Sequence, residues 1–307
     1  MLRELQVSLH EEENMKKKKR RKRRWTDLLL VLILLIGVAI VAYPSFSDYW
    51  NSFHQSRAIV SYAESVATLD NAEYERMWTE AMQYNGYLAQ KQNQWAIEPE
   101  ESEVYNARLN VGGTGNMGFI SIPRINVNLP VYHGTEESVL QTSAGHIEGT
   151  SLPVGSPHLD EEDFQKVAFG SHCVISGHRG LPSAKLFSDL DKMEIGDTFT
   201  FNVMDQILTY EVDAINVVEP EDSKLIELVP DQDLCTLVTC TPYGINTHRL
   251  LVRGHRIENE KAKLNIRVTA DAVRLDTLYT APFIAAPVLL LMAAYVMMMS
   301  GRRERRR

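Results

Sequence analysis

The chain of 307 residues has three cysteines, and no two of them form a Cys-x-x-Cys pair. Cys173, Cys235 and Cys240 are separated by 62 and five residues, and the nine histidines are scattered, so no zinc-ligand spacing is present. Walker loops, dinucleotide fingerprints and Gly-x-Ser-x-Gly elbows are also missing. The glycine-rich stretch at 112–115 precedes a predicted strand, which indicates a turn rather than a phosphate-binding loop. We therefore expect neither a metal nor a cofactor.

Basic residues are scarce between residues 28 and 301, where 17 of them stand against 34 acidic residues, a net charge of −17. An acidic region of this kind argues against nucleic acid as a partner. The basic residues are concentrated instead at the two ends, in Lys16–Arg24 and in five arginines within 302–307. Each basic cluster adjoins an apolar run, which is typical of the cytoplasmic flank of a membrane span.

Two apolar runs are long enough to cross a bilayer. The first, Leu28–Ala42, is extended to about 19 residues by Trp25 and Tyr43, which suit the two membrane interfaces. A cleavable signal peptide is the alternative, but no small-x-small cleavage site follows Tyr43, so a retained signal-anchor is favoured. The second run, Ala281–Met299, precedes the C-terminal arginines. The positive-inside rule then predicts two cytoplasmic termini and an extracellular middle.

The extracellular region divides into a helical part and a β-rich part. Apolar residues of Ser47–Gln92 recur near helical spacing and predict an amphipathic layer, which the stretch 98–101 with its proline would end. From Gly112 onward, short runs separated by Gly, Pro and Asn predict a closed or nearly closed β-barrel. The predicted strands are Gly118–Ile122, Leu129–Tyr132, Cys173–Ser176, Thr198–Val203, Ile207–Val218, Leu234–Cys240 and Thr247–Arg256. The acidic stretch Ser156–Val167 is predicted to be a surface insertion, with a regulatory or substrate-contacting role as the alternative.

Two β-rich runs around residues 236–254 predict the functional centre. They flank the turn formers of 242–246, so the first run ends at Cys240 and the second begins just before Arg249. Arg253 is four residues further along, about 13 Å at the rise of a strand, and is the poorer partner for the thiol. Arg249 is therefore the better candidate.

A nucleophilic thiol needs a proton acceptor and a cation that stabilises a thiolate or an oxyanion. His178 is the best acceptor, because it follows an apolar strand and opens a loop, where catalytic groups commonly lie. Cys173 and Cys235 each precede a candidate residue by five positions, an odd offset that puts them on the opposite face of their strands. They are predicted to be buried fillers, with a disulfide as the alternative. The histidines at 133, 146 and 172 are interpreted as polar surface or supporting groups.

The motifs around these residues resemble the sortase family of Gram-positive bacteria. They are Thr-Leu-Val-Thr-Cys240 with Arg249 nine residues later, and Gly-His178-Arg-Gly-Leu-Pro upstream. The continuation from Pro242 to Gly254 resembles class C, the pilin-polymerising sortases. Further similarity occurs at 117–123, 131–134 and 146–154, within a region of similarity that runs from residue 105 to residue 256. Several motifs in the same order are more specific than any single pattern.

The resemblance implies an eight-stranded barrel and a cysteine transpeptidase in which Cys240 is the nucleophile, His178 the acid and base, and Arg249 the oxyanion or substrate ligand. It implies that an LPXTG-like sorting signal is cleaved through a thioester acyl-enzyme and transferred to a lysine amine of another pilin subunit. A sortase that attaches proteins to cell-wall peptide, a hydrolytic cysteine protease and a non-enzymatic anchored adhesin or sensor are the alternatives. The implied location is the cell membrane of a Gram-positive bacterium.

Many pilin-polymerising sortases have an N-terminal lid with an Asp-Pro-aromatic motif that covers the cysteine. The nearest pattern in this chain, Glu98-Pro99-Glu100, lacks the aromatic ring, so a missing or open lid is predicted.

The resulting domain organisation is a cytoplasmic basic tail (1–24), a transmembrane signal-anchor (25–43), an extracellular helical region (44–104), a sortase barrel (105–260), a linker (261–280), a transmembrane helix (281–299) and a cytoplasmic basic tail (300–307).

Overall fold

The computed structural model describes residues 2–159 and 166–259. The predicted linker, second membrane span and C-terminal tail lie outside the described residues, as does the centre of the predicted insertion at 156–167. The described residues from 47 to 259 belong to one compact unit, and the described residues up to Phe46 belong to another. The structure therefore leaves the predicted domain boundaries beyond residue 259 as predictions.

The first predicted membrane span lies in helix α1, Leu2–Ala67. Within the described residues, its part from Leu28 is the one helix long and apolar enough to cross a bilayer. Most side chains of the apolar run are exposed to their surroundings, as lipid-facing residues would be. Pro44 removes one backbone hydrogen bond without ending the helix. One span is thus supported, whereas the second span at 281–299 remains a prediction.

The helical layer expected for Ser47–Gln92 is formed by the end of α1 and by α2, and a third helix, α3, follows it. Helix α2, Asn71–Gln90, begins at Asp70, whose Oδ1 accepts the backbone N–H of Glu73 at 2.8 Å. Helix α3, Pro99–Ala107, begins at Glu98, whose N–H donates to the Glu101 carboxylate at 3.0 Å. The stretch 98–101 therefore starts a helix as well as following one, because proline fits the first turn of a helix.

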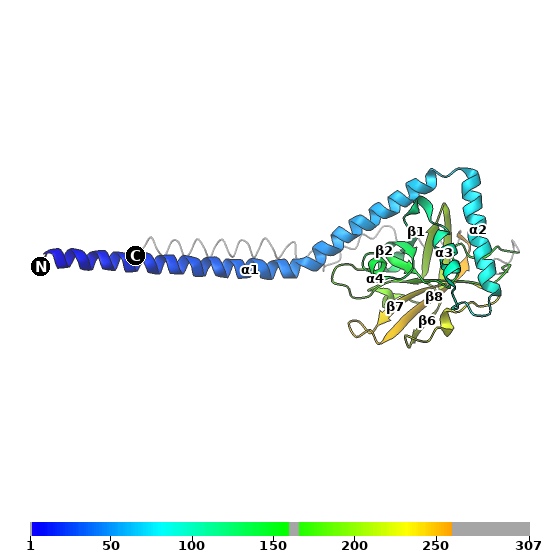
Figure 1. The fold of residues 1–307 in the computed structure, drawn as a ribbon. Helices are drawn as coiled ribbons and strands as arrows, with labels where there is room; N and C mark the ends of the chain where they lie inside the picture. The colour runs from blue at the N-terminus through cyan, green and yellow to red at the C-terminus, as the bar shows by residue number, and fades with distance from the viewer. Residues whose placement is uncertain (1, 160–165, 260–307) are drawn as a thin grey trace. The chain divides into compact units, whose positions relative to one another are not determined.

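Eight strands form a closed barrel, as the sequence predicts (Figure 1). Their order is β1-β2-β3-β4-β7-β8-β6-β5, and β5 pairs with β1 to close the sheet. The pairs β2·β3 and β4·β7 are parallel, and the others are antiparallel. The strands are β1 Asn116–Ile122, β2 Val127–His133, β3 Ala144–His146, β4 Ser171–Ser176, β5 Thr198–Val203, β6 Gln206–Val218, β7 Asp233–Thr241 and β8 His248–Ile257.

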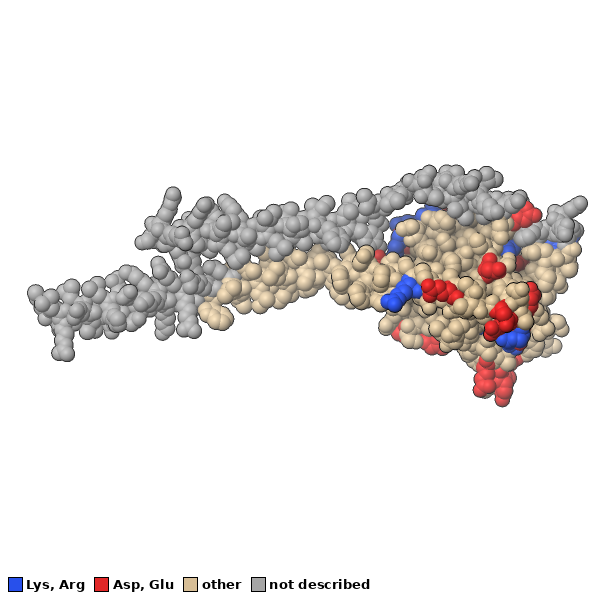
Figure 2. Space-filling model, turned by 90° about the horizontal axis from the view of Figure 1, so that it is seen from above, with Lys and Arg blue, Asp and Glu red and all other residues tan. Residues whose placement is uncertain are grey.

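Short helical segments connect the strands. They are α4 Glu137–Leu140 and the 3-10 turns Val111–Gly113, Pro123–Ile125, Leu190–Lys192 and Lys224–Ile226. Figure 2 shows several groups of acidic side chains and few basic ones on the visible face of the barrel unit. This agrees with the acidic composition of residues 28–301.

Large apolar side chains fill the barrel, and the helical layer is fastened to it by a buried amide. Phe199, Phe201 and Tyr210 are all but completely buried inside the sheet, and each contributes roughly 1.5–3 kcal/mol by leaving water. On α2, the buried Asn85 donates to the carbonyls of Leu152 and Gly155, both at 2.9 Å, and accepts from the Leu152 N–H at 2.7 Å. A buried side chain that is satisfied in this way specifies how the helix docks.

Three histidines interpreted as surface or supporting groups are in fact buried structural residues. His146 approaches the Ser151 carbonyl through Nε2 at 2.8 Å, and the Tyr105 hydroxyl lies 3.0 Å from its Nδ1. His172 places Nδ1 2.8 Å from the Glu227 carbonyl. His133 binds two backbone carbonyls in the same manner. Burial lowers the pKa of His146 to about 3 and of His172 to about 4, so both imidazoles are neutral in the folded protein.

We expect mild acid, between pH 7 and pH 5, to destabilise the barrel unit. Folding lowers the pKa values of His146 and His172. Their neutral rings therefore contribute to the free energy of unfolding above about pH 6.5, and this contribution is lost as the pH falls below that value. The loss is about 2 kcal/mol for each residue between pH 7 and pH 5. Burial raises the pKa of Asp233 to about 6. The effect of Asp233 therefore has the opposite sign: as the pH falls from 7 to 5, it raises the free energy of unfolding by about 1 kcal/mol.

The net expectation is a fall of about 2 to 3 kcal/mol in the free energy of unfolding. Urea denaturation of the full chain in detergent, followed by tryptophan fluorescence at a series of pH values, measures it. The variant His172→Gln should flatten the slope. An unfolding free energy that stays constant from pH 7 to pH 5 would contradict this account.

Candidate active site

Cys240 lies on β7, between β4, which leads to His178, and β8, which carries Arg249. In the antiparallel pair β7·β8, Cys240 is directly opposite Arg249, so their Cβ atoms are about 4.5–5.5 Å apart. In the parallel pair β4·β7, Ser176 is aligned with Val238. Continuing that register by two residues brings His178 to the level of Cys240. The barrel thus gathers the three predicted residues at one rim.

Backbone pairing continues past the end of β4 and extends this alignment toward the histidine. The N–H of Gly177 donates to the Val238 carbonyl at 3.0 Å, and the Thr239 hydroxyl donates to the Gly177 carbonyl at 2.7 Å. The next residue, His178, accepts from the Phe187 N–H through its carbonyl at 3.1 Å. The histidine is therefore the first residue of a loop that begins at the strand end.

Of the three cysteines, Cys240 is the one that solvent and substrate can reach. It is partly exposed, whereas Cys173 and Cys235 are buried, and all three are free thiols. Cys173 and Cys235 are aligned on β4 and β7 and interact with each other. Burial raises the pKa of the Cys173 thiol well above its usual value, which makes it a poor nucleophile. Their burial confirms that they are core fillers.

Two arginines of β8, Arg249 and Arg253, differ in the groups that they contact. Arg253 forms a two-point ion pair with Asp213, with Nε–Oδ1 at 2.9 Å and Nη2–Oδ2 at 3.2 Å. Arg249 donates to backbone carbonyls of Asn246 and His248 at 3.3 and 3.2 Å. Among the described residues, no carboxylate lies within ion-pair distance of Arg249. Its guanidinium is available to a substrate, which supports its selection over Arg253.

Glu137 is a neighbour of His178 that the sequence did not indicate. It begins α4, and its carboxylate lies 3.3 Å from Nε2 of the imidazole. The Glu137 side chain is 67% exposed, so the pair contributes little to stability. The contact with Glu137 uses Nε2 of His178 and does not occupy Nδ1. No periodic signal could reveal it, because the two residues are 41 positions apart and both lie in connections.

A polar stripe of α1, formed by Asp48, Asn51 and Gln55, contacts loops beside the candidate site. Asp48 accepts the Lys185 N–H at 2.6 Å, and Asn51 donates to the Ser183 carbonyl at 2.7 Å. Gln55 donates to the carbonyl of residue 142, shortly after α4, at 2.7 Å. This stripe therefore supports both the loop that follows the histidine and the segment that follows Glu137.

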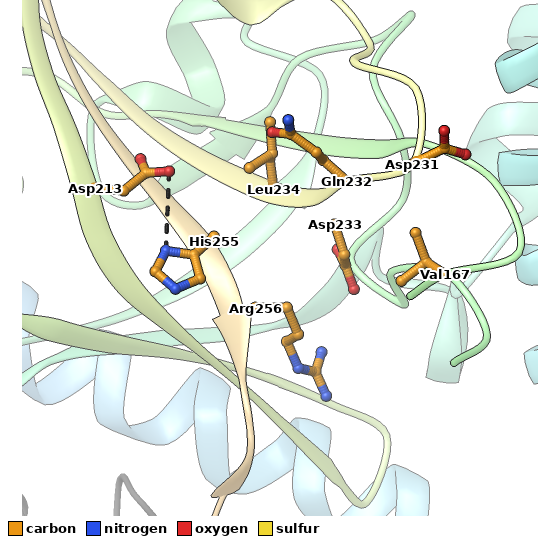
Figure 3. A pocket seen from close by; sticks show the side chains of 8 residues that line it. All are labelled: Val167, Asp213, Asp231, Gln232, Asp233, Leu234, His255 and Arg256. Atoms are coloured by element: carbon orange, nitrogen blue, oxygen red, sulfur yellow. Dashed lines mark ion pairs between the residues drawn. The ribbon is translucent and has the colours of Figure 1, made fainter. Parts of the chain in front are cut away.

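A cavity of about 480 Å³ lies at the opposite end of β7 and is not the candidate site. Figure 3 shows side chains that line it, among them Asp213, Asp233, His255 and Arg256. Asp233 begins β7, seven residues before Cys240 and therefore about 23 Å away along the strand. No group of three or more metal-ligating side chains occurs in the described part of the chain.

Comparison with known proteins agrees with this architecture. The sortase domain model matches residues 120–257. The crystal structure of sortase C1 from Streptococcus agalactiae is 47% identical with a TM-score of 0.61, over 66% of this chain and 99% of that one. Sortase C of Streptococcus pneumoniae is 40% identical with a TM-score of 0.55, over 66% and 97%. Sortase D of Bacillus subtilis is 27% identical over 46% of this chain, and the match spans 63% of that relative.

The barrel, the motifs and the relatives agree, and class C sortases are the structural relatives of this chain. The chain belongs to the sortase family of cysteine transpeptidases.

Proposed function

We propose that this chain is a membrane-anchored transpeptidase that cleaves an LPXTG-like sorting signal and transfers it to a lysine amine of a pilin subunit. The observation that carries the proposal is the placement of Cys240 on β7, between the strand leading to His178 and the strand bearing Arg249. Similarity to sortase C structures supports the choice of a pilin over other acceptors.

In the first half-reaction, Sγ of Cys240 attacks the carbonyl carbon of the Thr–Gly bond, and the proton of the thiol passes to His178. The oxygen becomes an oxyanion, which the guanidinium of Arg249 stabilises by hydrogen bonds. The C–N bond then breaks, and His178 donates a proton to the departing glycine amine. The product is a thioester between Cys240 and the threonine carbonyl.

In the second half-reaction, the lysine amine attacks that thioester. His178 accepts a proton from the nitrogen and passes it to the sulfur as the C–S bond breaks, which regenerates the thiol of Cys240. The new bond is an isopeptide bond, so repeated cycles produce a covalent polymer. Water competes with the amine at the same carbon, and shielding of the thioester favours transfer over hydrolysis.

A three-way acceptor experiment tests the proposal. The full chain in detergent is incubated with a labelled LPXTG peptide alone, with a lysine-bearing pilin, or with a wall-type peptide amine, and the products are identified by mass spectrometry. We expect an isopeptide adduct with the pilin lysine and a thioester on Cys240. Transfer only to the wall peptide would instead indicate a wall-anchoring sortase, and hydrolysis alone would exclude a transpeptidase.

A non-enzymatic adhesin or sensor makes a different prediction for the same experiment. It predicts no thioester with any peptide, and it predicts that replacing Cys240 leaves the biological function intact.

A further inference from the structure

Arg179, the residue after His178, connects the histidine loop to the strand that bears the cysteine. Its Nη1 donates to the Thr241 hydroxyl at 3.1 Å, and Thr241 immediately follows Cys240. Its Nη2 donates to the Asp191 carboxylate at 2.6 Å. The Arg179 side chain is only 9% exposed, and its bond to Thr241 is partly buried, whereas its bond to Asp191 lies at the surface, where the Asp191 side chain is 47% exposed. The two bonds hold the guanidinium in two directions at once, and the charged partner strengthens the contact.

The same guanidinium also packs against the connection between β7 and β8. Its central carbon lies 6.0 Å from the centre of the Tyr243 ring, which is within the range of a cation–π contact. Gly180, with a φ of +78°, lies so close to this ring that an added Cβ would be 2.9 Å from a ring carbon. Arg179 therefore contacts a residue adjacent to Cys240 and a residue of the turn that leads to Arg249.

The histidine needs such a contact because it lies beyond the last residue of β4. The strand ends at Ser176, and backbone pairing with β7 continues only to Gly177. On one side, the loop is held by the Phe187 N–H and by the Ser188 hydroxyl, which accepts from the Gly180 N–H at 3.0 Å. Those contacts fix the loop to itself. The bond from Arg179 to Thr241 fixes it to the cysteine strand.

We propose that Arg179 is a positioning residue that holds His178 at the level of Cys240. The catalytic importance of this role rests on the proposed transpeptidase function. It is not a second oxyanion ligand, because Asp191 already neutralises its charge and its side chain is buried. Its planar fork matches the Thr241 oxygen and the Asp191 carboxylate in two directions at once. A lysine ammonium is a point charge and cannot reproduce this geometry.

Four variants test the proposal in the full chain: Arg179→Gln, Arg179→Lys, Thr241→Val and the double variant Arg179→Gln/Thr241→Val. The matched control is Arg108→Lys, because Arg108 forms a 2.6 Å ion pair with Glu80 in the helical layer. The measurements are kcat and KM for the labelled LPXTG peptide per titrated active site, and the pH dependence of Cys240 alkylation by iodoacetamide. Counting active sites removes the effect of unfolded protein.

We expect Arg179→Gln to lower kcat by about 10- to 100-fold with KM nearly unchanged, because a displacement of about 1 Å in a catalytic group has an effect of this size. Arg179→Lys should recover part of that loss. The double variant should be no slower than Arg179→Gln alone, because both substitutions break the same hydrogen bond between Arg179 and Thr241. The pH profile of alkylation should shift in Arg179→Gln and stay unchanged in Arg108→Lys.

Normal kcat and an unchanged alkylation profile in Arg179→Gln would overturn the proposal, as would fully additive losses in the double variant. The alkylation readout needs no sorting signal. If the parent protein turned over no peptide while alkylation still depended on Arg179, the proposed function would fail and the positioning role would stand.

Discussion

Cys240→Ala is expected to abolish thioester formation and to lower turnover by at least about 1,000-fold, because the acyl-enzyme has no other nucleophile to form on. The thiol is partly exposed at the barrel rim and lies opposite Arg249. Mass spectrometry of the chain after incubation with an LPXTG peptide measures the effect directly. The mass of the acyl-enzyme should appear in the parent protein and be absent in the variant.

The other two cysteines provide matched controls for this prediction. Cys173→Ala and Cys235→Ala each remove a buried sulfur from the core, which should reduce the free energy of unfolding by about 1–3 kcal/mol. Turnover per folded molecule should stay near that of the parent protein. Equal loss of thioester formation in all three variants would contradict the assignment of Cys240 as the nucleophile.

Arg249→Lys is expected to lower kcat/KM by about 100- to 1,000-fold, the range seen when an oxyanion donor is lost. An ammonium keeps the positive charge but cannot present two parallel N–H groups to an oxyanion or a peptide carbonyl. Steady-state kinetics with the labelled peptide measure the loss. The thioester should still form slowly, because Cys240 and His178 are untouched.

Arg253→Lys is the control for that variant. Arg253 is occupied by Asp213 on β6, so its replacement should weaken an ion pair of the barrel wall and affect stability more than rate. If Arg249→Lys kept its activity and Arg253→Lys lost it, the wrong arginine would have been chosen.

Strand-borne features of this protein were predictable because they depend on neighbours in the sequence. Alternation and turn formers located β7 and β8, and with them the approximate level of Cys240 and Arg249. The same patterns predicted the closed barrel, and the resemblance of the motifs predicted the family; both are confirmed. Strand β3 was missed, because three residues are too few to show alternation. The roles of the three site residues stay predictions until the variants are measured.

Features that depend on distant partners could not be predicted. His172 was interpreted as a surface or supporting group, yet its ring is satisfied by a carbonyl 55 residues away. The contacts of Glu137 with His178 and of Arg179 with Asp191 are likewise fixed by folding rather than by local pattern. A polar residue in a sequence does not show whether the fold will supply it with a buried partner.

The division of the site between strands and a loop has a consequence for how activity is lost under stress. Cys240 and Arg249 are paired within the ladder of a closed barrel, and such paired strands are among the last parts of a protein to open. His178 lies past the end of β4, in a loop outside the ladder, and loops open at a lower free energy than core strands do. Under mild heat or denaturant, we therefore expect activity to be lost first through reversible displacement of the His178 imidazole. Cys240 and Arg249 should keep their register on the barrel, so activity should recover when the loop refolds.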